Sequence, residues 1–266
     1  MVIDIHCHVI PGIDDGANDI STALEMCRIA QADSTHGIIA TPHYIHGVIK
    51  NNSDIINAKV VELNRYVKEN NIDVEIYPGC EVFIFPELPQ LVREGYIGTL
   101  NNSRYVLIEL PMNSIPEYTN NVIYQLRLDE FIPIIAHPER NAVIYKNPDK
   151  LCDLISRGAL SQVNATSLSG LFGKSMRDKA IELLRHKMVH FIASDAHDAK
   201  DRLPKLSSAI DVIEKEIGPE ALLKVIKNGE AIFENQPIFS EDPINISKNY
   251  NIRFLPNFKK IVSRLL

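Results

Sequence analysis

The sequence predicts an α/β protein in which helices connect the parallel strands of one sheet or barrel. Apolar runs rich in β-branched residues alternate with helical patterns along the chain, which is typical of βα units. Each connection is long enough for the right-handed crossover that parallel neighbours require. The chain has 266 residues, enough for one sizeable core, and no low-complexity linker divides it, so we expect one main domain.

Seven apolar runs are expected to form the strands: residues 2–5, 37–41, 74–79, 104–108, 131–136, 160–164 and 189–193. Helical spacing of apolar residues predicts helices over residues 21–32, 53–69, 87–94, 116–128, 148–156 and 174–186, and two more over 205–217 and 219–227. Residues 239–266 lack another βα unit. We expect them to add a peripheral extension, a strand and a short helix, to a domain of residues 1–238.

The composition is that of a folded globular protein, with 45% hydrophobic and 23% charged residues, which excludes a disordered or collagen-like chain. The net charge is −6 and no long Lys/Arg block occurs, so nucleic acid is not expected as a main partner. The first residues contain no basic segment or apolar signal core, and no stretch approaches a membrane-spanning length. We therefore expect a cytoplasmic protein without membrane insertion.

The four cysteines are widely spaced and form no C-x-x-C pair, so neither a disulfide framework nor a thiolate zinc site is predicted. A cysteine phosphatase needs a nucleophile followed by a phosphate-binding loop that ends in Arg. The nearest match runs from Cys152 to Arg157, but the apolar spacing there is that of an ordinary helix. Reduced thiols without a catalytic role are expected.

Most of the predicted strands end in residues that bind divalent metal ions. The candidates at these ends are His6, His8, His43, Glu81, Glu109, His137, Asp195 and His197. In a closed parallel barrel these ends lie on one face, so the side chains are expected to converge there. His6 and His8 are two residues apart and point the same way, which leaves Cys7 to pack elsewhere. Only the sixth strand, which ends near Asn164, has no charged or imidazole candidate.

This set contains more ligands than one ion needs. Zinc or manganese takes about four to six ligands, so we expect two or three ions. Imidazole and carboxylate ligands without thiolate suit Mn, Fe or Zn. Neighbouring divalent ions supply hydroxide near neutral pH and stabilise attacking and leaving oxygens, so hydrolysis of a phosphate ester is the predicted chemistry.

The other histidines provide a comparison. His36, His46, His186 and His190 do not follow the pattern and are expected to have mostly structural roles. His46 stays a minor candidate for substrate contact because it lies close to His43 in the sequence.

Six short motifs carry these candidates: DIHCH (4–8), GIDDG (12–16), TPH (41–43), GCE (79–81), HPER (137–140) and ASDAH (193–197). Together they resemble the PHP (polymerase and histidinol phosphatase) superfamily of metal-dependent phosphoesterases. IPGIDDGA, NNSRYVLIELPMN and QVNATSLSGLFG make the chain most similar to the bacterial capsule and exopolysaccharide tyrosine-protein phosphatases. The resemblance covers residues 1–237.

The resemblance implies a distorted (β/α)7 barrel with three metal ions, manganese being the expected metal, at the carboxyl ends of the strands. The implied ligands are His6, His8, Glu81 and Asp195 for the first ion, Glu81, Glu109 and His137 for the second, and Asp15, His43 and His197 for the third. Asp14 competes with Asp15, and we favour Asp15 because it directly precedes Gly16 as in the family's Asp-Gly element.

Arg140 and Arg202 resemble the arginines with which the family binds phosphate, and their permanently charged forks suit phosphoryl oxygens. For Arg202 a surface ion pair is an equally good interpretation. The implied reaction is attack of metal-activated hydroxide on phosphotyrosine, in which Asp195 or His197 protonates the leaving group. The implied partner is the phosphotyrosine tail of a bacterial tyrosine kinase that regulates capsule or exopolysaccharide synthesis.

Three alternatives stay open at this point. A PHP phosphatase of a small phosphomonoester, such as histidinol phosphate, would use the same ligands. A non-catalytic, metal-stabilised regulatory module would require some ligands to be missing. An amidohydrolase is less consistent with the sequence, because such barrels typically carry a carbamylated lysine ligand and no Lys ends a predicted strand.

Overall fold

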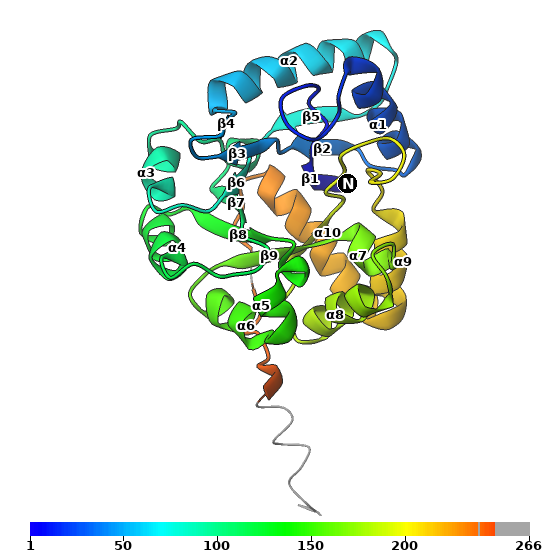
Figure 1. The fold of residues 1–266 in the computed structure, drawn as a ribbon. Helices are drawn as coiled ribbons and strands as arrows, with labels where there is room; N and C mark the ends of the chain where they lie inside the picture. Colours follow the sequence, from blue (N-terminus) through cyan, green and yellow to red (C-terminus); the bar gives the residue numbers. More distant parts are fainter. Residues whose placement is uncertain (239, 248–266) are drawn as a thin grey trace, which may run out of the picture.

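The computed structural model describes residues 1–238 and 240–247 and confirms the expected α/β fold (Figure 1). In the described residues, one sheet has three parallel strands in the order β1 (Ile3–Cys7), β2 (Gly37–Ala40) and β5 (Glu75–Pro78). The other sheet has the order β10 (Phe191–Ala193), β9 (Leu160–Asn164), β8 (Ile132–Ala136), β7 (Tyr105–Glu109), β6 (Glu81–Phe83), β3 (His43–Ile45) and β4 (Ile49–Lys50). All neighbours in this second sheet are parallel except the short antiparallel pair β3 and β4.

Two of the predicted strands continue as further strands that the sequence did not predict. After β2 the chain passes Pro42 and forms β3, and after β5 it passes Gly79 and forms β6. These strands have only three residues each and follow a break in the apolar run, so no alternation indicated them. Their parallel pairing sets His43 opposite Glu81 and so brings two candidate ligands together.

The two sheets meet at the carboxyl ends of β1 and β10. Cys7 forms an isolated parallel bridge with Ala196. The amide of His8 donates to the carbonyl of Ala196 at 2.8 Å, and the amide of Asp195 donates to the carbonyl of His6 at 2.8 Å. The first and the last candidate ligands of the chain are therefore held side by side by backbone hydrogen bonds.

The eight predicted helices are present with ends shifted by a few residues. They are α1 (Ile20–Ala32), α2 (Ser53–Glu69), α3 (Leu88–Arg93), α4 (Thr119–Leu128), α6 (Asp149–Ser156), α8 (Lys174–Arg185), α9 (Ser207–Glu216) and α10 (Pro219–Phe233). Two five-residue helices, α5 (Ala142–Lys146) and α7 (Ala165–Ser169), were not predicted because they are too short to show a helical period. The 3₁₀ turns η1 (Leu100–Asn102) and η2 (Pro138–Arg140) complete the set.

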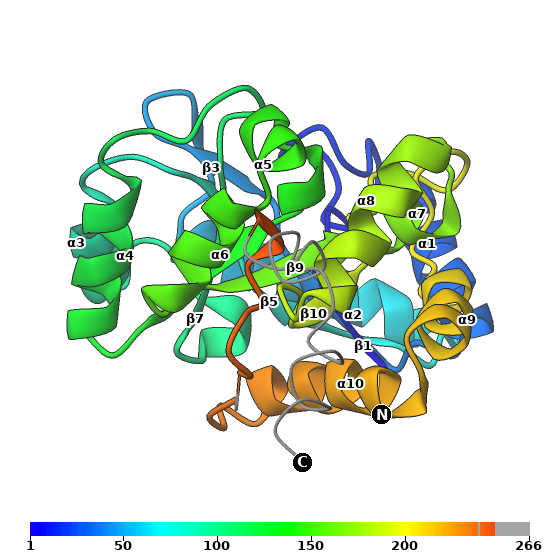
Figure 2. The same cartoon turned by 90° about the horizontal axis from the view of Figure 1, so that it is seen from below.

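Helix α10 lies across the end of the strands opposite the candidate ligands (Figure 2). It extends six residues beyond the predicted end at 227, to Phe233. Tertiary contacts stabilise the helix beyond Asn228 and Gly229. The side-chain amide of Asn228 donates to the carbonyl of His190, and Ile232 is fully buried. This helix closes the amino ends of the strands and leaves the opposite end for the site.

The segment after α10 is described only in part, because Phe239 and residues 248–266 lie outside the described residues. Within residues 240–247, the amide of Ile244 donates to the carbonyl of His186, and the amide of Ile246 donates to Asp149. The predicted strand and short helix of residues 239–266 thus fall mostly outside the described part. No helix among the described residues is long and apolar enough to cross a membrane.

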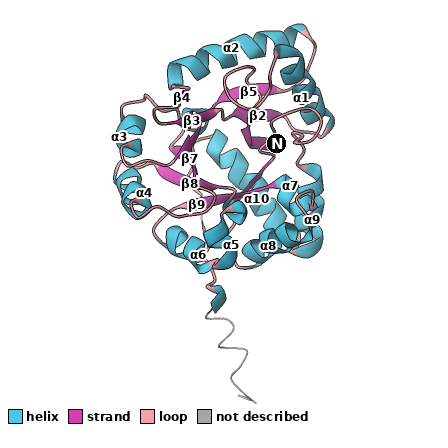
Figure 3. Ribbon diagram, viewed as in Figure 1, coloured by secondary structure: helices cyan, strands magenta, loops and turns pink. Residues whose placement is uncertain are grey.

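The strands are buried on both faces, as is typical of parallel strands covered by helices (Figure 3). Residues of one parity, such as Leu107 and Ile134, pack with Phe191 in an inner cluster. Their neighbours of the opposite parity, such as Ile108 and Ile135, pack in the larger cluster that includes the helices. The apolar runs therefore hold the strands in register, and the polar residues that follow them are left to form the site.

Candidate metal centre

Every candidate ligand predicted from the sequence lies near the carboxyl end of its strand or in the loop that follows. The strand-end candidates are His6 in β1, His8 after β1, His43 in β3, Glu81 in β6, Glu109 in β7, His137 after β8, and Asp195 and His197 after β10. Asp15 lies in the loop after β1. Ion-pair distances of 2.9–3.9 Å connect all nine side chains in one cluster.

Glu81 lies at the middle of this cluster and is fully buried. Its Oε2 atom is 3.2 Å from Nε2 of His6, 3.3 Å from Nε2 of His8 and 3.1 Å from Nδ1 of His43. Oδ1 of Asp195 lies 3.5 Å from Nε2 of His6 and 3.6 Å from Nε2 of His8. The atoms of His6, His8, Glu81 and Asp195 lie around one position, as the ligands of a first ion would.

The second oxygen of Glu81 faces a different group. Its Oε1 atom lies 2.9 Å from Nε2 of His137, which is 3.9 Å from Oε1 of Glu109. Nδ1 of His43 lies 3.9 Å from Oε2 of Glu109, so His43 also borders this group. Glu81 thus directs one oxygen to each of two neighbouring positions, which is the geometry of a carboxylate bridging two ions.

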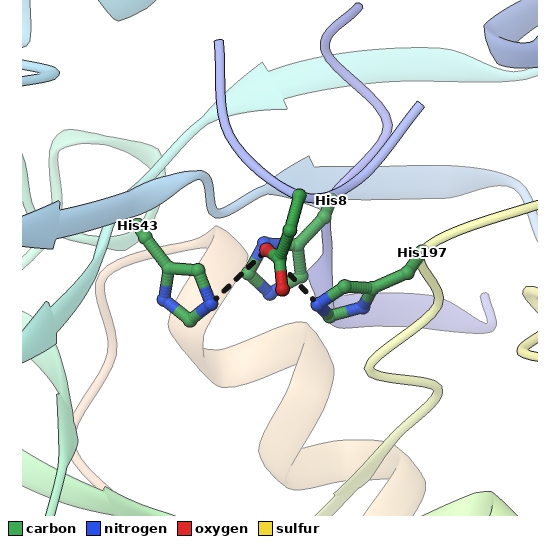
Figure 4. A group of neighbouring side chains, drawn as sticks. His8, His43 and His197 are labelled. Carbon is green, nitrogen blue, oxygen red and sulfur yellow. Dashed lines mark ion pairs between the residues drawn. The ribbon is translucent and has the colours of Figure 1, made fainter. Parts of the chain in front are cut away.

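A third group forms around Asp15. His8, His43 and His197 converge there (Figure 4), and Oδ1 of Asp15 is 3.4 Å from Nε2 of His43 and 3.5 Å from Nε2 of His197. Atoms of these four residues lie within 4.8 Å of one another. The Asp15 side chain is 67% exposed, so this group is the one that opens to solvent.

Asp14 has a different environment from Asp15. Its Oδ2 atom accepts hydrogen bonds from Nδ1 of His8 at 2.8 Å and from the amide of His43 at 3.0 Å, and its Oδ1 accepts from the amide of Gly16 at 2.9 Å. Gly16 permits this close packing, because a Cβ there would lie 2.1 Å from the carbonyl oxygen of His8. Asp14 is therefore occupied by hydrogen bonds to His8, Gly16 and His43, whereas Asp15 faces the imidazoles of His43 and His197.

The sixth strand provides two buried amide side chains that the sequence prediction missed. Gln162 Oε1 lies 2.9 Å from Nδ1 of His6, and Gln162 Nε2 donates to Oδ1 of Asn164 at 2.9 Å. Asn164 Nδ2 then donates to Oδ2 of Asp195 at 2.6 Å. Amides are neither charged nor imidazole, so the pattern of charged and imidazole residues at strand ends does not include them. Two polar residues alternating at the end of an otherwise apolar strand were the available signal.

These outer hydrogen bonds determine which nitrogens of the imidazoles are free for a metal ion. His8 uses Nδ1 toward Asp14 and His6 uses Nδ1 toward Gln162, so in the neutral rings both Nε2 atoms carry lone pairs. The two Nε2 atoms are 3.2 Å apart and both face an anionic oxygen of Glu81. Glu81 Oε2 and His43 Nδ1 are also buried without a hydrogen-bond partner in the described part. Without a cation, the nitrogen lone pairs and the negative charge of Glu81 repel one another. The residues present therefore fit a metal centre.

The pKa values in the cluster reflect the same charge balance. Burial lowers the pKa of His8, but the carboxylates of Asp14 and Glu81 reverse this effect and raise it to about 10. Burial also acts against the charged form of His137, and Glu81 again raises the pKa, to about 9. Burial and the charge of Glu81 raise the pKa of Glu109 to about 7. The cluster therefore attracts positive charge, which metal ions would supply in place of the protons.

His197 differs from these imidazoles. Burial and the neighbouring His8 lower the pKa of His197 to about 4. Its neutral form is therefore favoured near neutral pH, which suits a metal ligand better than a proton donor.

Two of the candidate residues have a left-handed backbone, which is uncommon outside glycine. The φ angle is 31° at His137 and 52° at Asp195, each directly after or close to the end of a strand. Such conformations cost about 1–3 kcal/mol and persist where the surrounding structure enforces them. At these positions they turn the chain so that the side chain points into the cluster.

Arg140 and Arg202 come from different loops and meet at Asp195. Nη1 of Arg140 is 3.0 Å and Nη2 of Arg202 is 2.6 Å from Oδ2 of Asp195. Each side chain is about a quarter exposed, at 26% and 27%. Arg202 is therefore more than a surface ion pair, because its partner is a buried candidate ligand. A guanidinium has five N–H donors, so both arginines keep donors for an anion at the mouth of the site.

The comparison histidines and the cysteines lie outside this cluster. His190 is buried, with Nδ1 accepting from the Ser161 amide, and His46 stacks on Phe85 with ring centroids 4.6 Å apart. All four cysteines are buried, and no disulfide joins any two of them. The Cys7 and Cys152 thiols join none of the metal-binding groups found in the described residues.

An α/β fold with imidazoles and carboxylates gathered around shared oxygens at its strand ends is that of a metal-dependent hydrolase. The chain belongs to the capsular polysaccharide synthesis CpsB/CapC family, whose model matches residues 2–234. It is 39% identical over 242 residues to the tyrosine-protein phosphatase YwqE of Bacillus subtilis (strain 168), covering 91% of this chain and 95% of that protein. It is 37% identical over 242 residues to the putative tyrosine-protein phosphatase CapC of Staphylococcus aureus, again with 91% and 95% covered.

The chain is also similar to solved structures of phosphatases. A chain from the crystal structures of YwqE and of CpsB from Streptococcus pneumoniae, described as metal-dependent tyrosine phosphatases, matches with a TM-score of 0.90 at 39% identity. The match covers 92% of this chain and 99% of that chain. Histidinol phosphate phosphatase of Lactococcus lactis matches with a TM-score of 0.55 at 14% identity over 82% of this chain and 94% of that chain, which shows a shared fold.

Proposed function

We propose that this protein is a metal-dependent protein-tyrosine phosphatase that hydrolyses phosphotyrosine. The observation that carries the proposal is Glu81, whose two oxygens face two separate groups of imidazoles and carboxylates. A carboxylate in this position suits a pair of neighbouring divalent ions, and such pairs serve phosphate ester hydrolysis. Relatives at 39% and 37% identity carry the name tyrosine-protein phosphatase, which supports the same reaction here.

The proposed centre holds two to three divalent ions, manganese being the expected metal. The proposed ligands are His6, His8, Glu81 and Asp195 for the first ion, Glu81, Glu109 and His137 for the second, and Asp15, His43 and His197 for the third. Iron, cobalt and zinc accept the same imidazole and carboxylate ligands.

When bound, these ions supply positive charge for the phosphoryl oxygens and lower the pKa of water so that it attacks at neutral pH. Arg140 and Arg202 bind the phosphoryl oxygens through the N–H groups that Asp195 does not use. Asp195 keeps both guanidinium groups directed at the site. The phenolate of tyrosine is a good leaving group, so protonation by Asp195 or His197 contributes little to the rate, in keeping with the low pKa of His197.

The strands are proposed to form a distorted (β/α)7 barrel within a catalytic domain of residues 1–238, with residues 239–266 as a peripheral extension. The hydrogen bonds between β1 and the residues after β10 support this arrangement, with β2 and β3 counted as one strand and β5 and β6 as another. We propose a cytoplasmic protein whose substrate is the phosphotyrosine tail of a bacterial tyrosine kinase in capsule or exopolysaccharide synthesis.

The test is the turnover of a phosphotyrosyl peptide and of histidinol phosphate by the full chain, before and after chelation and after readdition of Mn²⁺. We expect the peptide to be the better substrate, with activity lost on chelation and restored by Mn²⁺. His137→Ala and Asp195→Ala should each abolish turnover, because each removes a proposed ligand. Cys152→Ser is the matched control and should keep wild-type activity. Peptide turnover that survives complete metal removal, or rapid turnover of histidinol phosphate with an inert peptide, contradicts the proposal.

A further inference from the structure

Two adjacent apolar side chains, Leu171 and Phe172, lie exposed in the connection between α7 and α8. Leu171 is 60% exposed and Phe172 is 41% exposed. The ring centroid of Phe172 lies 5.8 Å from the guanidinium carbon of Arg140, which contacts Asp195 at 3.0 Å. Phe172 is thus one side chain away from the buried cluster.

The turn that carries these residues is held in one conformation. Gly170 and Gly173 flank it with φ angles of +88° and +91°, which only glycine adopts without strain. The amide of Leu171 donates to the carbonyl of Thr166 at 3.1 Å, and the amide of Gly173 donates to the carbonyl of Gly170 at 2.9 Å. The backbone that carries the two apolar side chains therefore has a fixed position relative to α7.

Helix α7 is in turn fixed to the HPER motif. The buried carboxylate of Glu139 accepts hydrogen bonds through Oε1 from the amide of Asn164 at 3.0 Å and from the hydroxyl of Ser167 at 2.8 Å. Glu139 directly precedes Arg140, and Asn164 contacts Asp195. The phosphate-binding arginine and the apolar turn are thus positioned by the same carboxylate.

Exposed apolar residues recur on the loops that follow strand ends. Val48 follows β3 and is 76% exposed, and Met112 follows β7 and is 40% exposed. Connections after parallel strands lie on the face where the strands end, which here is the face of the metal centre. Phe172 is the aromatic member of this group and the one in contact with a proposed phosphate ligand.

We propose that Phe172 forms an aryl-binding wall that selects aryl phosphates over alkyl phosphates. A phosphoryl group on Arg140 places its ester substituent next to the guanidinium, and the Phe172 ring already lies over that guanidinium. Aromatic rings pack with centroids about 4.5–7 Å apart, so a tyrosine ring beside Arg140 is within reach of Phe172. This inference rests on the proposed phosphatase function and explains how that site distinguishes phosphotyrosine from phosphoserine.

The experiment measures binding of phenylphosphonate and methylphosphonate to the Mn²⁺-loaded full chain by calorimetry. We expect the wild-type protein to bind phenylphosphonate about tenfold more tightly, a ratio in the range that one aromatic pair and its buried area supply. Phe172→Ala should weaken phenylphosphonate about tenfold and leave methylphosphonate unchanged, while Phe172→Tyr should keep the wild-type ratio. Tyr124→Ala, which removes an exposed aromatic from α4, is the matched control and should change neither affinity.

Equal weakening of both phosphonates in Phe172→Ala would show that Phe172 only holds Arg140 in place, and no weakening would show that the wall is not used. Either result overturns the inference. Phosphonates are not hydrolysed, so the outcome is independent of turnover. If the wall behaves as expected but the phosphotyrosyl peptide is inert, the proposed function fails and the aryl site stands. If the peptide is hydrolysed and Phe172→Ala binds both phosphonates normally, the function stands and this inference fails.

Discussion

Asp14 offers the sharpest test of how the centre is assembled, because it is buried against the ligands without joining them. Three donors converge on its carboxylate: Nδ1 of His8 at 2.8 Å, the amide of Gly16 at 2.9 Å and the amide of His43 at 3.0 Å. The hydrogen bond to His8 keeps the proton on Nδ1 and so keeps Nε2 free for a metal ion. Asp14→Ala removes this acceptor and leaves three donors without a partner.

The expected magnitude follows from the role of an outer partner. Loss of such a partner typically lowers metal affinity by about 10- to 100-fold, which corresponds to about 1.4–2.7 kcal/mol. Asp14→Asn should cost less than about tenfold, because the amide oxygen at the Oδ2 position still accepts from His8 and His43 and only the bond from Gly16 is lost. The order of affinities is therefore wild type, then Asn, then Ala.

The assay is the Mn²⁺ concentration that gives half-maximal phosphatase activity, together with the number of ions bound per chain in competition with a chelator. Asp14→Ala should shift the half-saturating concentration and approach wild-type turnover at high Mn²⁺. Asp15→Ala is the contrasting variant, and it should reduce the number of bound ions because Asp15 is the proposed ligand itself. The reasoning is refuted if Asp14→Ala binds Mn²⁺ with wild-type affinity. It is also refuted if Asp14→Ala loses a bound ion and Asp15→Ala does not.

Two further predictions concern residues that are not proposed ligands. Asn164→Ala should lower turnover by about 10- to 100-fold with little change in fold, because it removes a 2.6 Å hydrogen bond to Asp195. Steady-state kinetics measure the turnover and circular dichroism checks the fold. Unchanged turnover would contradict the prediction. Burial lowers the pKa of His190 to about 4 from an unfolded value of about 6.5. The unfolded chain thus binds this proton first, so the free energy of unfolding should fall by about 3 kcal/mol as the pH drops from 6.5 to 4. In His190→Asn, denaturant titrations should show a free energy of unfolding that falls less between pH 6.5 and 4, because the contribution of His190 is gone. If the free energy of unfolding falls equally with pH in the two proteins, the lowered pKa of His190 is not the cause.

The sequence predicted seven of the strands and the eight strand-end candidates because both leave a regular signal, whereas Asp15 came from the family resemblance. A buried parallel strand is a short apolar run, and a ligand at its carboxyl end is a polar residue directly after that run. His137 after β8 and Glu109 at the end of β7 are found by this rule. The pairing of β3 with β6, which sets His43 opposite Glu81, needed the structure because three-residue strands have no detectable alternation.

The outer partners escaped prediction for a different reason. Gln162, Asn164 and Asp14 act through hydrogen bonds whose geometry depends on contacts across the chain, such as the 156-residue separation between His6 and Gln162. An amide in a strand is compatible with many environments, so its residue type alone does not indicate a role. Only the direction of each hydrogen bond, from His6 through Gln162 and Asn164 to Asp195, assigns it.

That chain of hydrogen bonds also explains why the centre depends on the whole fold. His6 comes from the first strand, the two amides from β9 and Asp195 from the loop after β10, so the tautomer of His6 is fixed only when these strands have paired. Asp195 has a left-handed backbone, and its carboxylate forms ion pairs with the guanidinium groups of Arg140 and Arg202. The side-chain amide of Asn164 and the backbone hydrogen bond to His6 hold Asp195 in that conformation. The candidate centre therefore depends on strand pairing: the paired strands orient the imidazoles around the buried carboxylate of Glu81, and this arrangement suits a divalent cation.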